Sequence, residues 1–406
     1  MCADWSIEEY DDKEIPESEL SDEDVQYLDE EFDSELEIEG PSSLNDWSWV
    51  LRNEGYVGHI QLPGDTSIEL SPGIELDNVF GMLEYAYDLT RFNLDEENIY
   101  DSDTVEGFYD KIASIFAQNV NKRRKQGLFR SYQEREEKSE RIRGRIDFRK
   151  TVQKPWDPKA HVKYREMTAD NEHNQILLYT LNRISQSGFA RDETLQKVRD
   201  GIRSLRGSIS YQEFEANDCA GRRYNRLNQD YQRMHALARL ILDTSGPSQE
   251  KGDAEMIPYT VYMPDLYELF VARWMKENLP TGYSVDFQEQ VYLGDTGLFY
   301  RIDVILYDEV GDVVAVLDTK YREPDNGSPK SSEVSQVLGY AKRMETDRAF
   351  LVYPVQLDNS FPLTMDDVEI DCLQFGLKGD LEENGKDFLE NLSNILCLPD
   401  LRIQIG

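Results

Sequence analysis

The stretch that decides the fold is Tyr300–Arg322, which reads YRIDVILYDEVGDVVAVLDTKYR. Apolar and polar residues alternate on both sides of Asp308–Asp312, a pattern that predicts two strands joined by a tight turn. With the turn centred in that segment, Asp303 lies opposite Asp318 on the neighbouring strand. The two-residue repeat of a strand then puts Lys320 on the same face as Asp318. The sequence therefore predicts a β-hairpin on which two carboxylates and one ammonium group converge.

This grouping fits the hydrolysis of a phosphodiester. Mg²⁺ commonly takes one or two acidic ligands in addition to water and substrate phosphate, so Asp303 and Asp318 are the predicted metal ligands. A lysine beside them, here Lys320, can orient or deprotonate the attacking water. The other interpretation is an exposed edge strand, although a charged pair that ends the apolar run VVAVL is an unusual place for one.

The spacing D-x14-D-x-K resembles the core of the PD-(D/E)xK nucleases, with Arg301-Ile302 in place of the proline that often precedes the first aspartate. Gln336 and Tyr340 stand four residues apart on an expected helix and match the QxxxY element of RecB-like members. Glu268 lies on an amphipathic helix, where this fold carries a glutamate. The resemblance implies that Glu268 completes or supports the metal site, and that Gln336 and Tyr340 orient the core and the DNA backbone.

Each of these three residues also has a purely structural interpretation. Asp265 followed by Glu268 is a capping-box arrangement, so Glu268 could simply close the start of its helix. Gln336 could be a solvated polar residue and Tyr340 a half-buried aromatic. Their position around the hairpin favours the functional interpretation.

Four segments taken in order resemble the McrC family: SIELSPGIELDNVFGMLEYAYDL, IRGRIDFRKT, EMTADNEHNQILLYTL and YMPDLYELFVARWM. The resemblance runs from about Ser43 to the C-terminus. It implies a nuclease subunit that works with McrB, a hexameric AAA+ GTPase, on double-stranded DNA that carries modified bases. Arg143, Arg145 and Asp147 match the family's R-G-R-I-D-F-like segment, which implies a contact to DNA or to the GTPase. A solvated charged surface is the alternative for these three.

The expected fold is α+β and multidomain. Residues 1–42 contain few apolar positions and are predicted to form an acidic, flexible tail. Residues 43–250 are predicted to form a mixed β and helical region that binds the GTPase partner, with predominantly helical sequence from residue 151 to Thr244. The turn-rich stretch Gly246–Asp253 is the expected boundary. Residues 251–406 are predicted to form an α/β PD-(D/E)xK, restriction-endonuclease-like nuclease domain.

Composition sets further bounds on function. The 406 residues include no apolar run of the roughly 20 residues that a membrane span needs, and the N-terminus is acidic, so a cytoplasmic protein is expected. The four cysteines and four histidines lack the spacing of zinc or iron-sulfur sites. No G-x-x-x-x-G-K-[ST] loop occurs, so the chain is not expected to bind a nucleotide itself, and Mg²⁺ is the only expected cofactor.

The net charge of −36 is unusual for a protein that acts on DNA, since phosphate contacts favour a basic surface. Residues 1–40 hold 18 Asp or Glu and one Lys, so about half of the excess lies outside this segment. One explanation is a halophilic host, because charge at about 1 M salt is screened within about 3 Å. The second, which is compatible with it, is that the GTPase supplies most of the DNA affinity.

The sequence thus predicts a Mg²⁺-dependent DNA endonuclease subunit of a GTP-dependent, modification-dependent restriction system of the 5-methylcytosine type. Two alternatives stay open. One is a non-catalytic regulatory subunit that activates the partner GTPase, although intact Asp303, Asp318 and Lys320 argue against decay of a nuclease core. The other is a stand-alone RecB-like nuclease that processes DNA.

Overall fold

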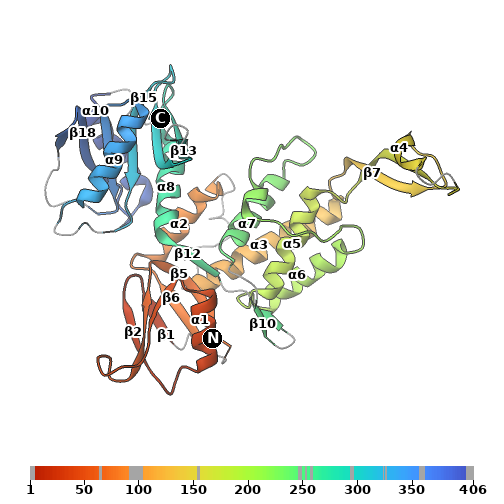
Figure 1. The fold of residues 1–406 in the computed structure, drawn as a ribbon, viewed down its shortest axis with the longest axis horizontal. Helices are drawn as coiled ribbons and strands as arrows, with labels where there is room; N and C mark the ends of the chain where they lie inside the picture. The colour runs from red at the N-terminus through yellow and green to blue at the C-terminus, as the bar shows by residue number, and fades with distance from the viewer. Residues whose placement is uncertain are drawn as a thin grey trace. The chain divides into compact units, whose positions relative to one another are not determined.

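The computed structural model describes residues 5–63, 66–90, 104–152, 156–245, 249–251, 254–256, 259–292, 297–322, 324, 327–355 and 362–398. Two compact units make up the chain (Figure 1): residues Met1–Val105 together with Tyr259–Gly406 form the first, and residues Glu106–Pro258 form the second. Each contains both helices and strands, so the expected mixed α/β, multidomain architecture is confirmed.

The C-terminal part of the first unit is built on a six-stranded sheet in the order β13-β14-β15-β16-β18-β17. β13, β14 and β15 are antiparallel, whereas β15, β16 and β18 run parallel. The hairpin predicted within Tyr300–Arg322 is confirmed as β14 and β15. The six strands are β13 (Ser284–Tyr292), β14 (Phe299–Tyr307), β15 (Val313–Thr319), β16 (Arg348–Tyr353), β17 (Leu363–Met365) and β18 (Val368–Gln374).

Three helices flank this sheet: α8 (Met263–Asn278), α9 (Ser331–Met344) and α10 (Leu381–Leu396). α9 makes the crossover that the parallel pair β15 and β16 requires, and its Val334 and Val337 pack into a buried cluster with Leu351 of β16. α8 and α10 touch closely, since a Cβ added to Gly385 would lie 2.1 Å from Trp274. The expected order of helix, hairpin, helix and strand is therefore present.

The N-terminal part of the first unit folds from the first residue that the structure describes. The elements are β1 (Trp5–Glu8), β2 (Asp12–Pro16), α1 (Asp22–Glu31), β3 (Leu36–Glu39), β4 (Ser48–Asn53), β5 (Tyr56–Gln61), β6 (Ser67–Ser71) and α2 (Leu76–Ala86). They form two sheets, β2-β4-β3 and β1-β6-β5-β12, the last strand being β12 (Tyr259–Tyr262).

The prediction that residues 1–42 form a flexible tail is wrong for residues 5–39. Their few apolar side chains are buried in a common core with β4, β5 and β6. The hydroxyl of Ser21 accepts a hydrogen bond from the Asp24 backbone N–H and so caps α1. The prediction failed because a low apolar content does not exclude a core when most of the few apolar side chains are buried. The buried apolar residues of this segment are Ile7, Ile15, Leu20, Tyr27, Leu28, Phe32 and Leu36.

The expected division between residues 43–250 and 251–406 also needs correction, because residues up to 105 belong with the C-terminal sheet. β12 pairs with β5, from which it is separated by about two hundred residues of chain. The side-chain amide of Asn78 on α2 donates to the carbonyl of Leu377, at 2.8 Å. The boundary expected at Gly246–Asp253 lies just before the second unit ends at Pro258, and Gly246–Ser248, Gly252 and Asp253 lie outside the described residues.

The second unit combines helices with a three-stranded sheet in the order β7-β9-β8. β9 contradicts the expected helical sequence after residue 151, because it is a strand that pairs antiparallel with β7 along its whole length. The elements are α3 (Val105–Gln126), β7 (Ser131–Ser139), β8 (Arg145–Ile146), α4 (Phe148–Thr151), β9 (Ala160–Thr168), α5 (Glu172–Gln186), α6 (Asp192–Leu205), the 3-10 helix η3 (Ala216–Cys219), α7 (Tyr231–Asp243), β10 (Gln249–Lys251) and β11 (Ala254–Met256).

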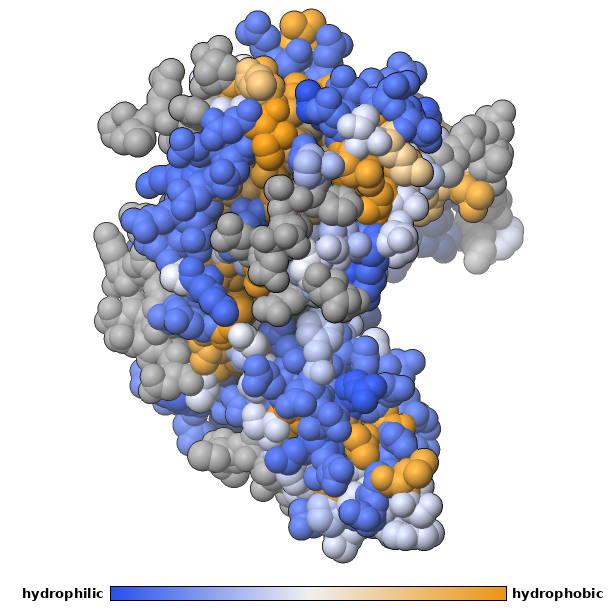
Figure 2. Space-filling model, turned by 90° about the vertical axis from the view of Figure 1, so that its left-hand side faces the viewer, coloured by the Kyte–Doolittle hydropathy of each residue, from blue (hydrophilic) through white to orange (hydrophobic). Residues whose placement is uncertain are grey.

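The surface is dominated by polar and charged residues. Figure 2 shows one face of the molecule, on which hydrophilic side chains prevail and hydrophobic ones form small, separate groups. Of the helices that the structure describes, none has the length and apolar character needed to cross a bilayer.

The folding of residues 5–39 leads to a prediction about salt. Their carboxylates sit on a folded surface and repel one another over about 30 Å at 0.01 M salt but only about 3 Å at 1 M. We therefore predict that the midpoint of thermal unfolding of the whole chain rises steeply between about 0.1 and about 3 M KCl. A flat profile, measured by circular dichroism, would refute adaptation to a saline cytosol and leave partner-supplied DNA affinity as the explanation of the charge.

Candidate active site

The register of the hairpin brings the two predicted aspartates together. Val304 pairs with Leu317 and, continued by one residue, the same register pairs Asp303 with Asp318 as expected. Asp303 Oδ2 accepts hydrogen bonds from the backbone N–H of Thr319 at 2.7 Å and from its hydroxyl at 3.1 Å. One oxygen of Asp303 is thus fixed by the backbone of the opposite strand.

The turn that sets this register is held by one side chain. Asp308 Oδ1 accepts hydrogen bonds from the backbone N–H groups of Val310, Gly311 and Asp312, each at 2.9 Å. Gly311 has a φ of 92°, which side chains other than hydrogen rarely tolerate. The turn chemistry is therefore local, and it explains why the sequence alone located the hairpin.

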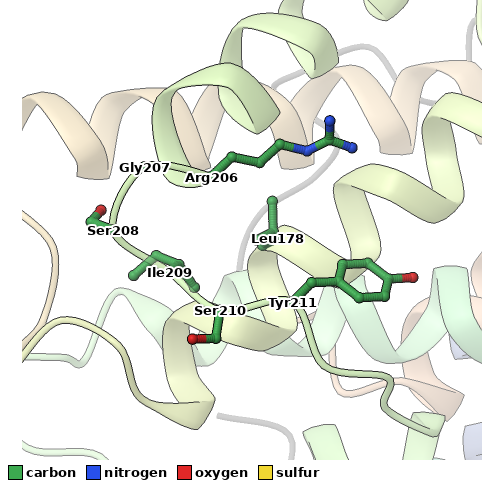
Figure 3. A pocket seen from close by; sticks show the side chains of 7 residues that line it. All are labelled: Leu178, Arg206, Gly207, Ser208, Ile209, Ser210 and Tyr211. Atoms are coloured by element: carbon green, nitrogen blue, oxygen red, sulfur yellow. The ribbon is translucent and has the colours of Figure 1, made fainter.

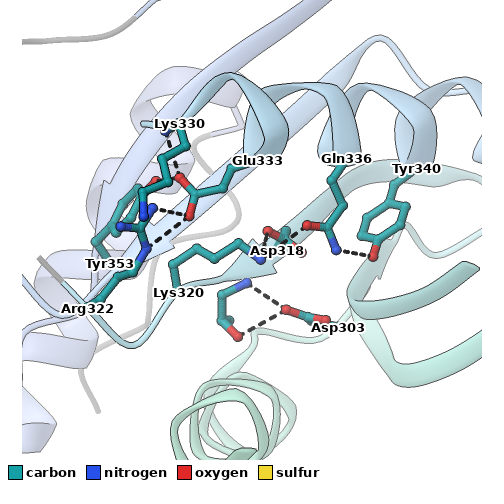
Figure 4. Close-up of polar contacts among 10 residues, drawn as sticks. Asp303, Asp318, Lys320, Arg322, Lys330, Glu333, Gln336, Tyr340 and Tyr353 are labelled. Atoms are coloured by element: carbon teal, nitrogen blue, oxygen red, sulfur yellow. Dashed lines mark hydrogen bonds and ion pairs between the residues drawn. The ribbon is translucent and has the colours of Figure 1, made fainter. Parts of the chain in front are cut away.

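Lys320 joins Asp318 as predicted (Figure 4). Asp318 is completely buried, and its Oδ2 lies 2.6 Å from Lys320 Nζ. Lys320 Nζ also donates to Gln336 Oε1 at 3.4 Å, and Gln336 Nε2 donates to the hydroxyl of Tyr340 at 2.6 Å. The structure therefore places Asp303, Asp318, Lys320, Gln336 and Tyr340 in one group of side chains.

Glu268 belongs to the same neighbourhood but not as a cap. α8 begins at Met263, and no side chain caps its first turn, so Glu268 lies beyond the position that a capping box uses. Its Oε1 lies 3.5 Å from Arg301 Nη2 on β14. The structural alternative for Glu268 is therefore not supported, and its carboxylate is available to the site.

The three carboxylates resist ionisation together. Burial raises the pKa of Asp318 to about 7, and the nearby charge of Asp303 acts in the same direction while Lys320 opposes it. Burial likewise raises the pKa of Glu268 to about 7, with Asp303 adding to the shift and Arg301 opposing it. Burial also raises the pKa of Asp303, against the hydrogen bonds from Thr319. Burial is thus the main cause of all three shifts, and the charge of Asp303 adds to those of Asp318 and Glu268.

These residues fit a divalent cation. Both carboxylate oxygens of Asp318 and Oε1 of Glu268 are buried without a well-aligned hydrogen-bond donor, despite the short ion pair of Asp318 to Lys320. Among the residues that the structure describes, no three His, Cys, Asp or Glu side chains gather closely enough to cage a metal. Mg²⁺ needs only one or two carboxylates, the rest coming from water and phosphate, so Asp303 and Asp318 suffice, with Glu268 in support.

Two features of this region were missed from the sequence. Gln288 lies within β13 between residues that pair with Val304 and Ile302, which sets it level with Asp303, and its φ of 54° is uncommon for a non-glycine residue in a strand. A hydrogen bond from Gln288 also acts to lower the pKa of Glu268. A glutamine in a strand belongs to no sequence pattern that would reveal its hydrogen bond to Glu268.

The second feature is a link from the N-terminal strands to the hairpin. The hydroxyl of Tyr321, the residue after Lys320, donates to Glu9 Oε1 at 3.3 Å. Glu9 also accepts a hydrogen bond from the backbone N–H of Gly73 at 3.1 Å. The supposed tail therefore touches the residue next to the catalytic candidate.

The second compact unit contains Arg143, Arg145 and Asp147, whereas the hairpin residues belong to the first. Arg143 and Arg145 are exposed on and beside β8, whereas Asp147 caps α4 by accepting from the Lys150 backbone N–H at 3.1 Å. Asp147 thus has a structural role, and the two arginines remain free to contact a partner.

The second unit also contains a pocket of about 630 Å³ (Figure 3). Its lining contains no carboxylate or histidine, the hydroxyl of Ser210 is bound to Asp170 Oδ2 at 2.7 Å, and its cation Arg206 already donates to Asn182 Oδ1 at 2.9 Å. We assign it no catalytic chemistry. The lining residues are Leu178, Arg206, Gly207, Ser208, Ile209, Ser210 and Tyr211.

The chain is similar to known proteins in family and in fold. A family model described as McrBC 5-methylcytosine restriction system component matches residues 51–354. No curated protein matches the chain. A chain from the refined half-complex of a tetradecameric assembly of Thermococcus gammatolerans McrB AAA+ hexamers with bound McrC is 16% identical, with a TM-score of 0.55, and the match covers 96% of this chain and 99% of that one.

A chain from a cryo-EM structure of the Thermococcus gammatolerans McrBC complex is also 16% identical, with a TM-score of 0.44, and the match covers 67% of this chain and 87% of that one. Only the first match, with a TM-score above 0.5, bears on the fold, and at 16% identity neither bears on the roles of individual residues.

The raised pKa values lead to a prediction about metal binding. Protons compete with a cation for Asp318 and Glu268 at pH values below about 7, because burial raises the pKa of each to that value. We predict that Mg²⁺ raises the midpoint of thermal unfolding at about pH 8, and that this increase shrinks as the pH falls to about 5.5.

The Asp318→Asn variant should lose this increase, whereas Glu309→Gln, on the exposed turn of the same hairpin, should keep it. An equal increase in Asp318→Asn and the unchanged protein would show that Mg²⁺ binds elsewhere.

Proposed function

We propose that this chain, which belongs to the McrBC family of 5-methylcytosine restriction system components, is the subunit that cuts DNA. It would do so by Mg²⁺-dependent hydrolysis of phosphodiesters. The observation that carries the proposal is the convergence of Asp303, Asp318 and Lys320 beside Gln336. A non-catalytic subunit would have no reason to keep two aspartates and a lysine in a buried group that costs folding free energy.

Each side chain has a proposed task that follows from its contacts. Asp303 and Asp318 would hold Mg²⁺, with Glu268 supporting them. When bound, the ion would polarise the phosphate and make a water molecule more nucleophilic. Lys320, held between Asp318 and Gln336, would orient the attacking water and stabilise the negative charge that develops on the phosphate.

The hydroxyl of Tyr340 accepts a hydrogen bond from Gln336 Nε2, which orients the amide so that Gln336 Oε1 faces Lys320. Both therefore act on the lysine rather than on the metal. The ring of Tyr340 also packs against Tyr300, with the two centroids 5.2 Å apart, which anchors the pair to β14.

We predict that Lys320→Ala lowers DNA cleavage by orders of magnitude while the protein stays folded. Each factor of ten corresponds to about 1.4 kcal/mol of barrier, and the loss of a charge beside the reacting phosphate commonly removes several such units. Cleavage of methylated plasmid DNA is measured after reconstitution with the GTPase. Lys342→Ala, which removes an exposed lysine from α9, is the matched control.

Normal cutting by Lys320→Ala would sink the assignment of the site. If the unchanged protein stimulated the GTPase but never cut DNA, the regulatory-subunit alternative would replace the proposal. Cutting that needed neither GTP nor the partner would instead favour a stand-alone nuclease.

We also propose that the chain binds a McrB-like hexameric AAA+ GTPase and, with it, double-stranded DNA that carries modified bases. The support is the fold shared with a chain from the assembly of McrB hexamers with bound McrC. The net charge of −36 agrees with a division of labour in which the partner provides most of the DNA affinity. We place this activity in the cytoplasm.

The β7-β9-β8 sheet of the second unit is the proposed contact with the GTPase. Arg143 and Arg145 are exposed there, and two large apolar side chains of the same segment, Ile142 and Phe148, are also exposed. Exposed apolar groups rimmed by charges are typical of protein-binding surfaces rather than of DNA-binding ones.

We predict that the double variant Arg143→Ala, Arg145→Ala lowers stimulation of the GTPase at least tenfold, because two charges are removed from a surface where they would meet a partner. Its thermal shift with Mg²⁺ should be unchanged, since the metal site lies in the other unit. Arg203→Ala, which removes an exposed arginine from α6, is the control. Full stimulation by the double variant would show that the contact lies elsewhere.

A further inference from the structure

Arg322 and Glu333 form a close ion pair beside the proposed site. Arg322 follows β15 by three residues, and Glu333 lies in the first turn of α9. Glu333 Oε1 accepts hydrogen bonds from Arg322 Nη2 at 2.6 Å and from Arg322 Nε at 3.1 Å (Figure 4). Glu333 is only 6% exposed, so this pair is made inside the protein.

The second oxygen of Glu333 is equally well bound. Glu333 Oε2 accepts from the hydroxyl of Tyr353 at 2.9 Å and from the backbone N–H of Lys330 at 2.9 Å. Burial alone would raise the pKa of Glu333, but the hydrogen bonds from Arg322, Lys330 and Tyr353 hold that pKa below its ordinary value. Glu333 therefore differs from Asp318, whose oxygens lack such donors. It is a saturated charge and not a candidate metal ligand.

The pair runs alongside the contact that holds Lys320. Lys320 and Arg322 are two residues apart after the same strand, and their partners Gln336 and Glu333 are three residues apart on the same helix. Figure 4 shows both contacts bridging from the strand to α9. The arginine contact is the stronger of the two, because it has two donors and is buried, whereas Lys320 reaches Gln336 through one bond of 3.4 Å.

Tyr353 adds a third element to the arrangement. Tyr353 is the last residue of β16. The backbone N–H of Lys320 donates to the carbonyl of Val352 on the same strand, at 2.8 Å. Glu333 thus ties the end of β15, the end of β16 and the start of α9 to one another. Lysine has a flexible four-carbon side chain, so the position of its ammonium group depends on such surroundings.

We propose that Arg322 and Glu333 are positioning residues, which fix the first turn of α9 against the end of β15 and so keep Gln336 within reach of Lys320. They act through Lys320 and do not touch the DNA or the metal. The inference rests on the proposed nuclease function, and it adds two residues that the D-x14-D-x-K and QxxxY patterns do not contain.

The test uses the full chain reconstituted with its GTPase partner and measures single-turnover cleavage of methylated DNA. Arg322→Met and Glu333→Gln should each lower the cleavage rate at saturating DNA on the order of 10²-fold, the effect expected from misplacing a reacting group by about 1 Å. The DNA concentration at half-saturation and the thermal shift with Mg²⁺ should stay unchanged. Arg322→Lys, which keeps the charge but loses the paired donors, should fall between Arg322→Met and the unchanged protein.

Arg348→Met is the matched control, because it removes another arginine–glutamate pair, with Glu369, from the other end of β16. This variant should cut within about twofold of the unchanged protein, since its pair lies away from Lys320. An equal loss of cleavage in Arg348→Met and Arg322→Met would reduce the role of Arg322 to general stability of the sheet.

A second measurement separates positioning from a merely structural role. In a Gln336→Ala background the contact to Lys320 is already lost, so adding Arg322→Met should cost much less than it costs alone. If Arg322→Met lowered the cleavage rate by the same factor with and without Gln336→Ala, the proposal would be overturned. Normal cutting by Arg322→Met, with Lys320→Ala inactive, would also overturn it and leave the proposed function intact. If Lys320→Ala cut normally as well, the proposed function itself would fail.

Discussion

The structure depends on one electrostatic constraint: the hairpin register forces Asp303 and Asp318 together in the interior with a single lysine beside them. When both are ionised, two carboxylates and one ammonium group leave a net negative charge where water is largely excluded, and such a charge is costly to bury, which is why burial raises the pKa values of both aspartates. Glu268 adds to the excess and Arg301 offsets part of it. A divalent cation is the simplest counter-charge, and the proposed hydrolysis of DNA would give that cation a use.

The scaffold that carries this charge is drawn from both ends of the chain. Tyr321 donates to Glu9 in the first strands, and its ring lies against Tyr267 of α8, with centroids 5.8 Å apart. Tyr267 in turn donates to the carbonyl of Phe375 at 3.1 Å. The segment after Lys320 is therefore held from several sides, by N-terminal strands, by α8 and, through Arg322, by α9. An acidic N-terminal stretch has become part of the support for the site.

The sequence predicted the parts of the site that are local. The turn at Asp308, the alternation along both strands and the four-residue spacing of Gln336 and Tyr340 all lie within short windows, and the structure places these side chains as expected. Residues 5–39 were misjudged because a few apolar residues fill a core that later strands complete. The same limit hid the pairing of β12 with β5 and the partnership of Arg322 with Glu333, since no local pattern records a contact between distant segments. Gln288 was missed because an unusual backbone angle leaves no trace in residue type.

The proposed chemistry requires Asp303 and Asp318 to share one divalent cation. The most direct measurement is anomalous diffraction from crystals of the chain grown at about pH 8 with Mn²⁺ in place of Mg²⁺. An anomalous peak bound by oxygens of both aspartates is expected, at a distance slightly longer than the roughly 2.0–2.1 Å of Mg²⁺ sites, because Mn²⁺ is the larger ion. A peak elsewhere, or none at the hairpin while the ammonium group of Lys320 stays against Asp318, would contradict it.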